Sequence, residues 1–162
     1  MESYKILVPT DFTVRSLLPV KKAIEQLPYA TLSVFLLHGI YLPTSITDML
    51  YFSKHRVIRE LQEPEFEDAC ALLKSKYYSR IHTMVADVIV SNSNSHFSHY
   101  LEANAINELF IPENLQLNFS RGSSFDILPL MKRARIKSTT ISFDPQNSKY
   151  TDPAKIADLF FL

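Results

Sequence analysis

The stretch YKILVPTDFT, residues 4–13, decides the fold of this chain. Its apolar run ILV, residues 6–8, is continuous, which is typical of a strand buried on both faces of a parallel sheet. The run stops abruptly at PTD, residues 9–11, and a helical pattern begins after it. We therefore expect a central strand whose carboxyl end carries Thr10 and Asp11, where open parallel sheets place their ligands.

Four later runs rich in β-branched and aromatic residues predict further strands: TLSVFLLHGI (31–40), HTMVADVIV (82–90), ELFI (108–111, ended by Pro112) and TTISF (139–143). Helical spacing falls between them, after residue 13 or 16, from Pro64, around 97–103 and from about Gly122, with a shorter helix at 49–52 in an otherwise irregular segment. Strands that alternate with helices predict an α/β fold, a three-layer sandwich around a parallel sheet.

Because of two prolines, each of two predicted helices has two possible arrangements at its start. Pro19 fits the first turn if Ser16 caps the first helix, whereas a cap at Thr13 would place a kink at Pro19. Pro129 requires that the helix near Gly122 either begins at residues 124–126 or bends.

The composition of the chain limits the classes of function it can have. The 162 residues predict one domain, and 17 basic side chains balance 17 acidic ones, so no net field favours nucleic acid or a membrane surface. The chain has a single cysteine, Cys70, and no apolar run approaches the roughly 20 residues of a membrane span. Because a strand begins after three residues, we expect no signal peptide and a cytoplasmic protein. The chain has only two glycines, Gly39 and Gly122, which argues against a glycine-rich phosphate loop.

Three stretches resemble the universal stress protein family: KILVPTDFT (5–13), TLSVFLLHGI (31–40) and RGSSFDILPLMKRARIKSTTISF (121–143). The resemblance implies an adenine nucleotide alpha hydrolase-like fold with five parallel strands in the order 3-2-1-4-5. It also implies one domain over residues 1–145 and a homodimer through the last strand. Thr139, Thr140, Ile141, Ser142 and Phe143 form that strand. We expect the extension 146–162 to pack on the domain or the dimer interface, with the apolar residues 159–162 assisting.

Nucleotide-binding members of that family use a loop of pattern G-x-x-G-x9-G-[ST]. Here Gly122 and Ser123 match only its end, while Pro112 and either Leu109 or Leu115 stand where the other glycines belong. Proline has no amide to donate, so we expect that ATP is not bound in the family's manner. If ATP or AMP binds, the resemblance and the strand ends give the contacts as Thr10, Asp11, Gly39, Gly122, Ser123 and Ser124, and Asn114, Asn118, Ser120 and Arg121 would make a different polar site.

Each candidate also has a plainer interpretation. Asp11 is either a ribose contact or a turn and cap residue, and residues 121–124 either bind an anion at a helix start or cap the helix. His38 at a strand end is a packing residue more often than a ligand or a base. His96 and His99 lack the further ligands of a metal site. Cys70 lies on the apolar face of its helix, so we expect a core residue.

Three functions remain open. The first is a non-catalytic dimeric module of stress response or signalling that acts through protein partners. The alternative is a nucleotide-binding stress protein with an altered phosphate loop, for which slow ATP hydrolysis is conceivable. A third is an adenylate-forming or electron-carrier relative, supported only by the general architecture.

Overall fold

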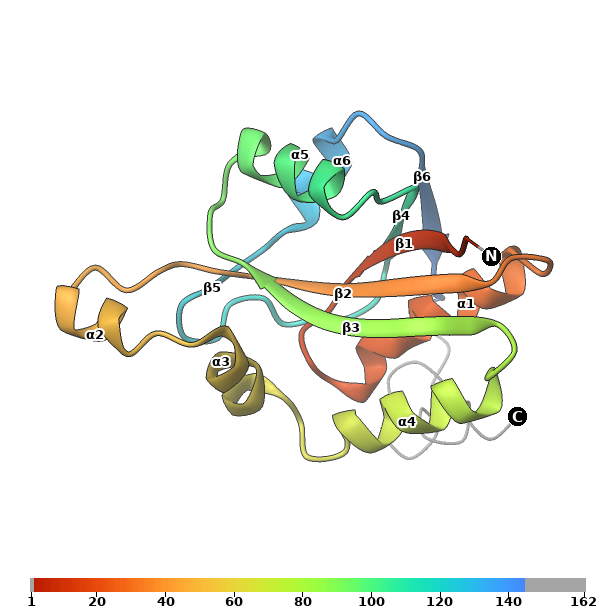
Figure 1. Cartoon of the computed structure of the whole chain (residues 1–162), viewed down its shortest axis with the longest axis horizontal. Coiled ribbons are helices and arrows are strands. Elements are labelled where there is room, and N and C mark those ends of the chain that lie inside the picture. The colour runs from red at the N-terminus through yellow and green to blue at the C-terminus, as the bar shows by residue number, and fades with distance from the viewer. Residues whose placement is uncertain (1, 145–162) are drawn as a thin grey trace.

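The computed structural model describes residues 2–144 of the chain, so the predicted extension 146–162 lies outside the described residues. The elements follow one another as β1 (Tyr4–Pro9), the 3₁₀ helix η1 (Val14–Leu17), α1 (Leu18–Gln26), β2 (Leu32–Ile40), α2 (Ile46–Leu50), α3 (Lys54–Leu61), α4 (Phe66–Lys76), β3 (Ile81–Ile89), α5 (Asn94–Ala103), β4 (Glu108–Glu113), β5 (Ser124–Phe125), α6 (Leu128–Arg133) and β6 (Ser138–Ser142). Figure 1 shows how they surround one sheet.

Five strands of the sheet are parallel and lie in the order β3-β2-β1-β4-β6. With β6 as the fifth parallel strand, this is the predicted order 3-2-1-4-5, and the three-layer α/β fold is confirmed. The prediction missed β5, a two-residue strand that pairs antiparallel with the end of β2. Helices α1, α3 and α4 lie on one side of the sheet, and α5 and α6 on the other (Figure 1).

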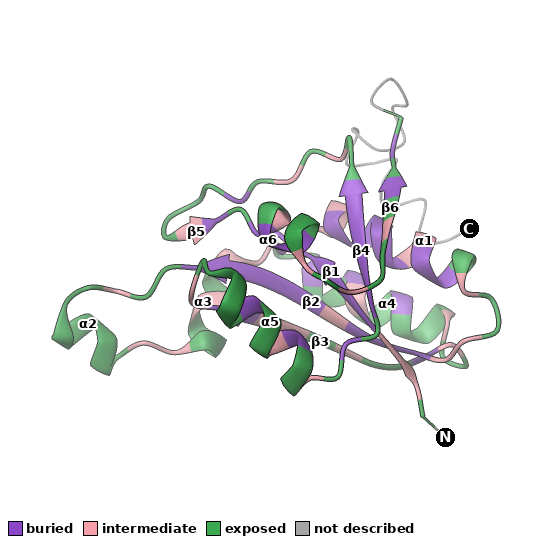
Figure 2. Cartoon of the chain, turned by 90° about the horizontal axis from the view of Figure 1, so that it is seen from above, coloured by how far each residue is buried: buried purple, intermediate pink, exposed green. Residues whose placement is uncertain are grey.

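The central strand β1 is buried on both sides, as its continuous apolar run predicts (Figure 2). Ile6 and Val8 face the core formed with α1 and α4. Leu7 faces the second core, formed with α5 and α6. Successive strand residues point to opposite faces, so one unbroken apolar run supplies both cores.

The first helical segment follows neither of the two predicted starts. Residues Val14–Leu17 form a 3₁₀ turn, and α1 starts afresh at Leu18 with Pro19 in its first turn. Proline is tolerated there because first-turn amides have no partner within the helix. Thr13 precedes the 3₁₀ turn but makes no side-chain cap, because its hydroxyl donates to Asp11 instead.

The helix expected from Gly122 is wrong. Ser124 and Phe125 are in β5, and α6 begins only at Leu128, so Pro129 again falls in a first turn. The predicted end of the fourth strand is also wrong, since β4 continues through Pro112 to Glu113. Beyond Leu109 the strand pairs only with β6, which spares Pro112 a hydrogen bond on the β1 side.

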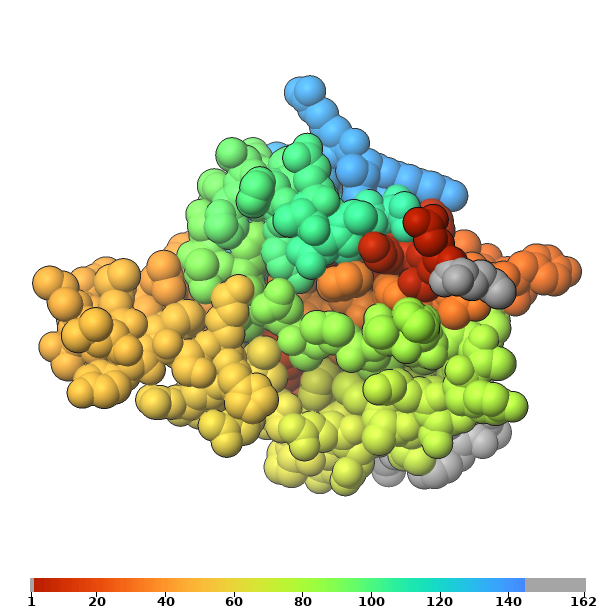
Figure 3. Space-filling view, viewed as in Figure 1, coloured from red at the N-terminus to blue at the C-terminus, as the bar shows by residue number. Residues whose placement is uncertain are grey.

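The segment after β2 projects from the body of the molecule (Figure 3). It carries α2, which includes part of the predicted short helix and has no buried residue, and then α3, which was not predicted. Ile46 and Leu50 are 79% and 77% exposed. Within residues 2–144, no helix has both the length and the apolar character needed to cross a membrane.

Candidate functional site

The carboxyl ends of β1 and β2 meet at the position where parallel sheets place ligands, and Thr10, Asp11 and His38 gather there. All three are buried, with exposed fractions of 0%, 2% and 1%. Buried polar groups need partners, so the question is what satisfies them.

The carboxylate of Asp11 is satisfied by the protein's own chain. Its Oδ1 accepts hydrogen bonds from the amide and the hydroxyl of Thr13, at 3.2 and 2.5 Å. Its Oδ2 accepts a bond of 2.9 Å from the amide of Asn118, more than a hundred residues away. Asp11 therefore acts as a turn residue, and it also fixes a distant loop to the end of β1.

That loop, residues 114–123 between β4 and β5, folds over the ends of the first two strands; we call it the β4–β5 loop. Nη2 of Arg121 donates to the carbonyl oxygens of Asp11 and Leu61, at 3.0 and 2.7 Å. Phe119 is buried, and its ring centroid lies 6.0 Å from that of His38. The loop thus places an apolar ring and a cation against the strand ends.

Thr10 closes the turn from inside. Its hydroxyl accepts from the amide of Phe12 at 2.9 Å and shares a bond of 2.8 Å with the hydroxyl of Ser16. Phe12 has φ 62°, a left-handed conformation that is strained for a bulky residue, while its side chain is fully buried. Its ring packs edge-on against Phe66, with centroids 5.8 Å apart. Packing of the ring offsets the strain and holds the turn.

His38 links β1 to β5. Its Nδ1 lies 2.8 Å from the carbonyl oxygen of Thr10, and its Nε2 lies 2.6 Å from the hydroxyl of Ser124. Burial lowers the pKa of His38 below 6.5, against opposing contributions from the Thr10 carbonyl and Asp11, while Arg121 lowers it further. The imidazole is therefore neutral at pH 7.

The two glycines play different parts. A Cβ on Gly39 would lie 2.4 Å from the ring of Phe125 and 2.6 Å from Ile127, so the end of β5 and the residues after it already occupy the space beside Gly39. Gly122 has φ 53° and nothing within 4 Å of an added Cβ. Ser123 is exposed, and its carbonyl accepts from the amide of Tyr41 at 2.8 Å.

The predicted contacts are therefore brought together only in part. Thr10 and Ser124 meet through His38, while Gly39 faces Phe125. No helix begins at residues 122–124, so neither the anion site nor the helix cap expected there exists in that form. The turn at Gly122 leads into β5 instead.

Two other contributors escaped the sequence prediction. Phe119 is one. Glu63 is the other: its amide donates to the carbonyl of Phe12 at 2.9 Å, and its Oε2 accepts from the amide of Val14 at 2.8 Å. The Asn- and Ser-containing composition of the β4–β5 loop indicated polar contacts by Asn118 and Arg121. No pattern indicated Phe119 or Glu63.

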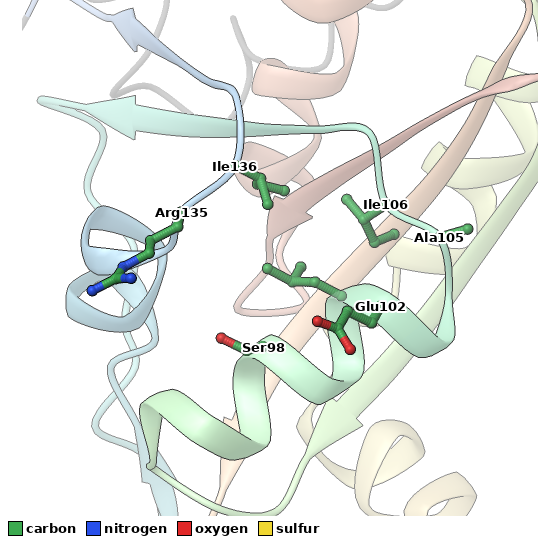
Figure 4. A pocket seen from close by; sticks show the side chains of 7 residues that line it. Ser98, Glu102, Ala105, Ile106, Arg135 and Ile136 are labelled. Carbon is green, nitrogen blue, oxygen red and sulfur yellow. The ribbon is translucent and has the colours of Figure 1, made fainter.

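Hollows also occur away from the strand ends. One of about 320 Å³ lies between α5 and the segment after α6 (Figure 4), lined by Ser98, Leu101, Glu102, Ala105, Ile106, Arg135 and Ile136. Another, of about 360 Å³, lies between α3, α4 and β3 and is lined in part by Cys70, whose pKa burial raises to about 12. Cys70 is partly buried against the core, and its raised pKa favours the neutral thiol over the thiolate that reacts as a nucleophile. His96 and His99 are exposed on α5, and residues 2–144 contain no group of three His, Cys, Asp or Glu side chains suited to a metal ion.

No protein-family model matches the sequence, and no curated protein matches it. Solved structures do match. Hypothetical protein MJ0577 superposes with a TM-score of 0.53 at 15% identity, over 89% of this chain and 99% of that one. A universal stress protein family member from Burkholderia pseudomallei superposes with a TM-score of 0.52 at 12% identity, over 86% of this chain and 96% of that one. A family member from Arabidopsis thaliana with AMP bound gives 0.49 at 13% identity, over 93% and 98%.

The chain has the fold of the universal stress proteins. The resemblance seen in the sequence is confirmed at this level by structures that share the whole domain but little sequence. Because fold alone does not fix activity, the function has to be argued from the strand ends described above.

Proposed function

We propose that this protein is a universal stress protein-like module that acts by binding partners rather than by turnover, in stress response or signalling. It works as a homodimer in the cytoplasm, and it does not bind ATP in the family's manner. Its partners are proteins; neither nucleic acid nor membrane is among them, because 17 basic and 17 acidic residues leave no net charge to attract either.

One observation carries the proposal: the buried polar groups at the strand ends, where open parallel sheets place their ligands, are bonded to the protein's own chain. Both carboxylate oxygens of Asp11 accept hydrogen bonds from the chain, and Arg121 donates a hydrogen bond to the carbonyl oxygen of Asp11. The buried ring of Phe119, on the same loop, packs beside His38. A nucleotide would have to break these contacts before it could make its own.

The phosphate side supports the same conclusion. Phosphates bind well at helix N-termini, where free amides and the helix dipole coincide. Here the chain after Gly122 enters β5, and α6 begins only at Leu128. Pro112 stands in the region where close backbone approach to a phosphate requires glycine and a free amide.

The test is a titration of the purified protein with ATP, AMP and other nucleotides, by calorimetry and by thermal shift. We expect neither heat of binding nor a change in melting temperature at millimolar ligand. A dissociation constant in the micromolar range would contradict the proposal. As a matched comparison, Arg121→Ala removes the two hydrogen bonds that the loop donates to the carbonyl oxygens of Asp11 and Leu61, and it leaves the hydrogen bonds of the Asp11 carboxylate in place. A response to nucleotide in this variant alone would support occupation of the site by the loop.

A second candidate is a nucleotide-binding protein, for ATP or AMP, with an altered phosphate loop and at most slow ATP hydrolysis. The observation that favours it is the exposure of Arg121, Gly122 and Ser123, which form one accessible end of the β4–β5 loop. Under this candidate, protein purified without added nucleotide would release one on denaturation, detectable by its absorbance. Under the first proposal the supernatant contains none.

A further inference from the structure

Ser124 and His38 form a hydrogen-bonded pair that the binding role described above does not use. The distance from Ser124 Oγ to His38 Nε2 is 2.6 Å. The opposite ring nitrogen, Nδ1, lies 2.8 Å from the carbonyl oxygen of Thr10. A hydroxyl, an imidazole and a fixed third group in this order are the arrangement that activates nucleophiles.

The proton positions follow from the partners. A carbonyl oxygen only accepts, so Nδ1 of His38 carries the hydrogen and donates it to Thr10. Nε2 of the neutral ring then has a lone pair, and the hydroxyl of Ser124 donates to it. Nε2 is therefore placed to receive the hydroxyl proton when Ser124 Oγ attacks an electrophile.

The serine can also be reached. Ser124 is partly exposed, and the residues that precede it, Arg121 to Ser123, are exposed. The position of a Cβ on Gly122 has no atom within 4 Å. His38, in contrast, is buried between the rings of Phe12 and Phe119, which shield it from water.

We propose that Ser124 is a nucleophilic serine, activated by His38, that accepts an acyl group from a small activated acyl donor such as a phenyl ester or a thioester. Ser124 Oγ attacks the carbonyl carbon, and its proton passes to His38 Nε2. The bond from carbon to the leaving oxygen or sulfur then breaks, and the leaving group takes the proton from His38. The products are an acyl ester on Ser124 and a free phenol or thiol.

The reaction is stoichiometric rather than a cycle. Stabilisation of the oxyanion by backbone amides is a large part of hydrolase catalysis. Here the amide of Ser124 already donates to the carbonyl of Arg121 at 2.9 Å, so the nucleophile's own amide is not available. Only acyl donors with a good leaving group are therefore expected to react, and each chain is acylated once instead of turning over substrate.

The test uses p-nitrophenyl acetate on the full chain, with intact mass and peptide mapping as the measurement. We expect one acetyl group per chain, on Ser124, and none in Ser124→Ala. Ser91→Ala is the matched control, because Ser91 is also partly exposed but its hydroxyl contacts another hydroxyl, that of Ser93 at 3.4 Å. This variant should be acetylated as the wild type is. His38→Gln should slow the reaction by about 100-fold, the usual contribution of a general base.

Because His38 is buried and its replacement could unfold the chain, the pH dependence of the wild-type rate gives an independent measurement. The rate should rise with the neutral fraction of His38 and reach its plateau at a lower pH than an unperturbed imidazole would give, since burial lowers the pKa of His38. The charged groups that act on His38 are Asp11 and Arg121. A rate that climbs steadily into the alkaline range, or acetylation of Ser124 no faster than of Ser91, would overturn the proposal.

Discussion

Gly39 and Gly122, the two glycines of the chain, serve opposite needs. Gly39 provides space, because the side chains of Phe125 and Ile127 approach it to 2.4–2.6 Å of a would-be Cβ. Gly122 provides backbone freedom, because its φ of 53° suits glycine while the space around it is empty. One residue type thus has two physical roles in the same site.

Replacing Gly39 by alanine should therefore destabilise the fold. The added methyl overlaps Phe125, and overpacking of a well-packed region costs about 1–3 kcal/mol in the free energy of unfolding. Denaturation in urea measures it. Gly122→Ala is the control: with no clash, only its left-handed conformation should cost, about 1 kcal/mol.

A second comparison separates the overlap with Phe125 from the one with Ile127. In the double variant Gly39→Ala, Phe125→Leu, the smaller side chain relieves the overlap with Phe125 but not the one with Ile127. The two losses of stability should therefore add to more than the loss in the double variant. Simple additivity would show that the overlap with Ile127, rather than with Phe125, sets the cost.

At the scale of elements, the opposite end of the sheet is joined by one buried carboxylate. Glu108 at the start of β4 is 2% exposed; its Oε1 accepts from the hydroxyl of Tyr4 at 2.8 Å and its Oε2 from that of Thr139 at 2.7 Å. Lys137 adds an ion pair at 3.3 Å. One side chain thus connects β1, β4 and the edge strand β6.

Glu108→Gln should loosen this junction. The amide nitrogen of glutamine cannot accept, so one of the two hydroxyls loses the acceptor to which it now donates, which costs about 1–3 kcal/mol of unfolding free energy. Burial, then the bond to Glu108 and its charge, raise the pKa of Tyr4 to about 12, and the variant should bring that pKa back toward 10. Tyrosinate absorbance during an alkaline titration measures the change.

The pH dependence of stability, measured by urea denaturation at several pH values, gives a second test of this junction. A pKa raised on folding stabilises the native state below the unfolded value of 10, and this stability is lost as the pH rises from 10 toward 12. Glu113→Gln is the matched control at the other end of β4. The side chain of Glu113 is exposed and accepts from the hydroxyl of Ser142 at 2.9 Å, so stability should change by less than about 0.5 kcal/mol. An equal loss in both variants would contradict the junction.

The elements were predictable where a pattern spans the whole element. The first three strands agree with the sequence prediction to within one residue. Burial on both faces requires the apolar runs of β1 and β2. The edge strand β3 is largely exposed or half-buried, and its β-branched residues indicated it instead. Helix α3 was missed although Val57, Ile58 and Leu61 have helical spacing and Ser53 caps it, accepting from the amide of Arg56 at 3.3 Å. Its eight residues are too few to stand out from the irregular segment around them.

The candidate site was predictable only on the β1 side. The PTDF turn carries its own signature, since the side chains of Thr10 and Asp11 bond backbone amides two residues ahead. The occupation of the site by the β4–β5 loop has no such signature. It depends on the backbone amide of Asn118 and on backbone carbonyl oxygens that accept from Arg121, and every residue type but proline supplies both groups.

For the whole molecule, the proposed dimer through residues 139–143 can be stated more closely. Strand β6 is an edge of the sheet among the described strands, but Ile141 and Phe143 are buried within the protomer. The side chains left for a partner are polar, with Ser138, Thr140 and Ser142 exposed. Pairing would therefore rest mainly on backbone hydrogen bonds between two edge strands.

Thr140→Lys tests this dimer, because charged side chains on an edge strand oppose pairing. We expect a dimer for the wild type in light scattering and a monomer for the variant. Thr83→Lys introduces the same charge at an exposed position of β3, the other edge, and should leave the dimer intact. A wild-type protein that is monomeric at every concentration would refute the dimer.

The occupation of the strand ends by the β4–β5 loop has a thermodynamic consequence for any external ligand. A tethered segment competes at an effective concentration that reaches the millimolar range for short links. A free molecule therefore meets a vacant cleft only in the fraction of chains whose loop has lifted, and its apparent affinity falls by that fraction. If about one chain in a hundred is open, a micromolar ligand binds as if its dissociation constant were about a hundred times larger. A partner that displaces Phe119 and Arg121 would restore that affinity. Binding of an external ligand at the strand ends would then depend on such a partner.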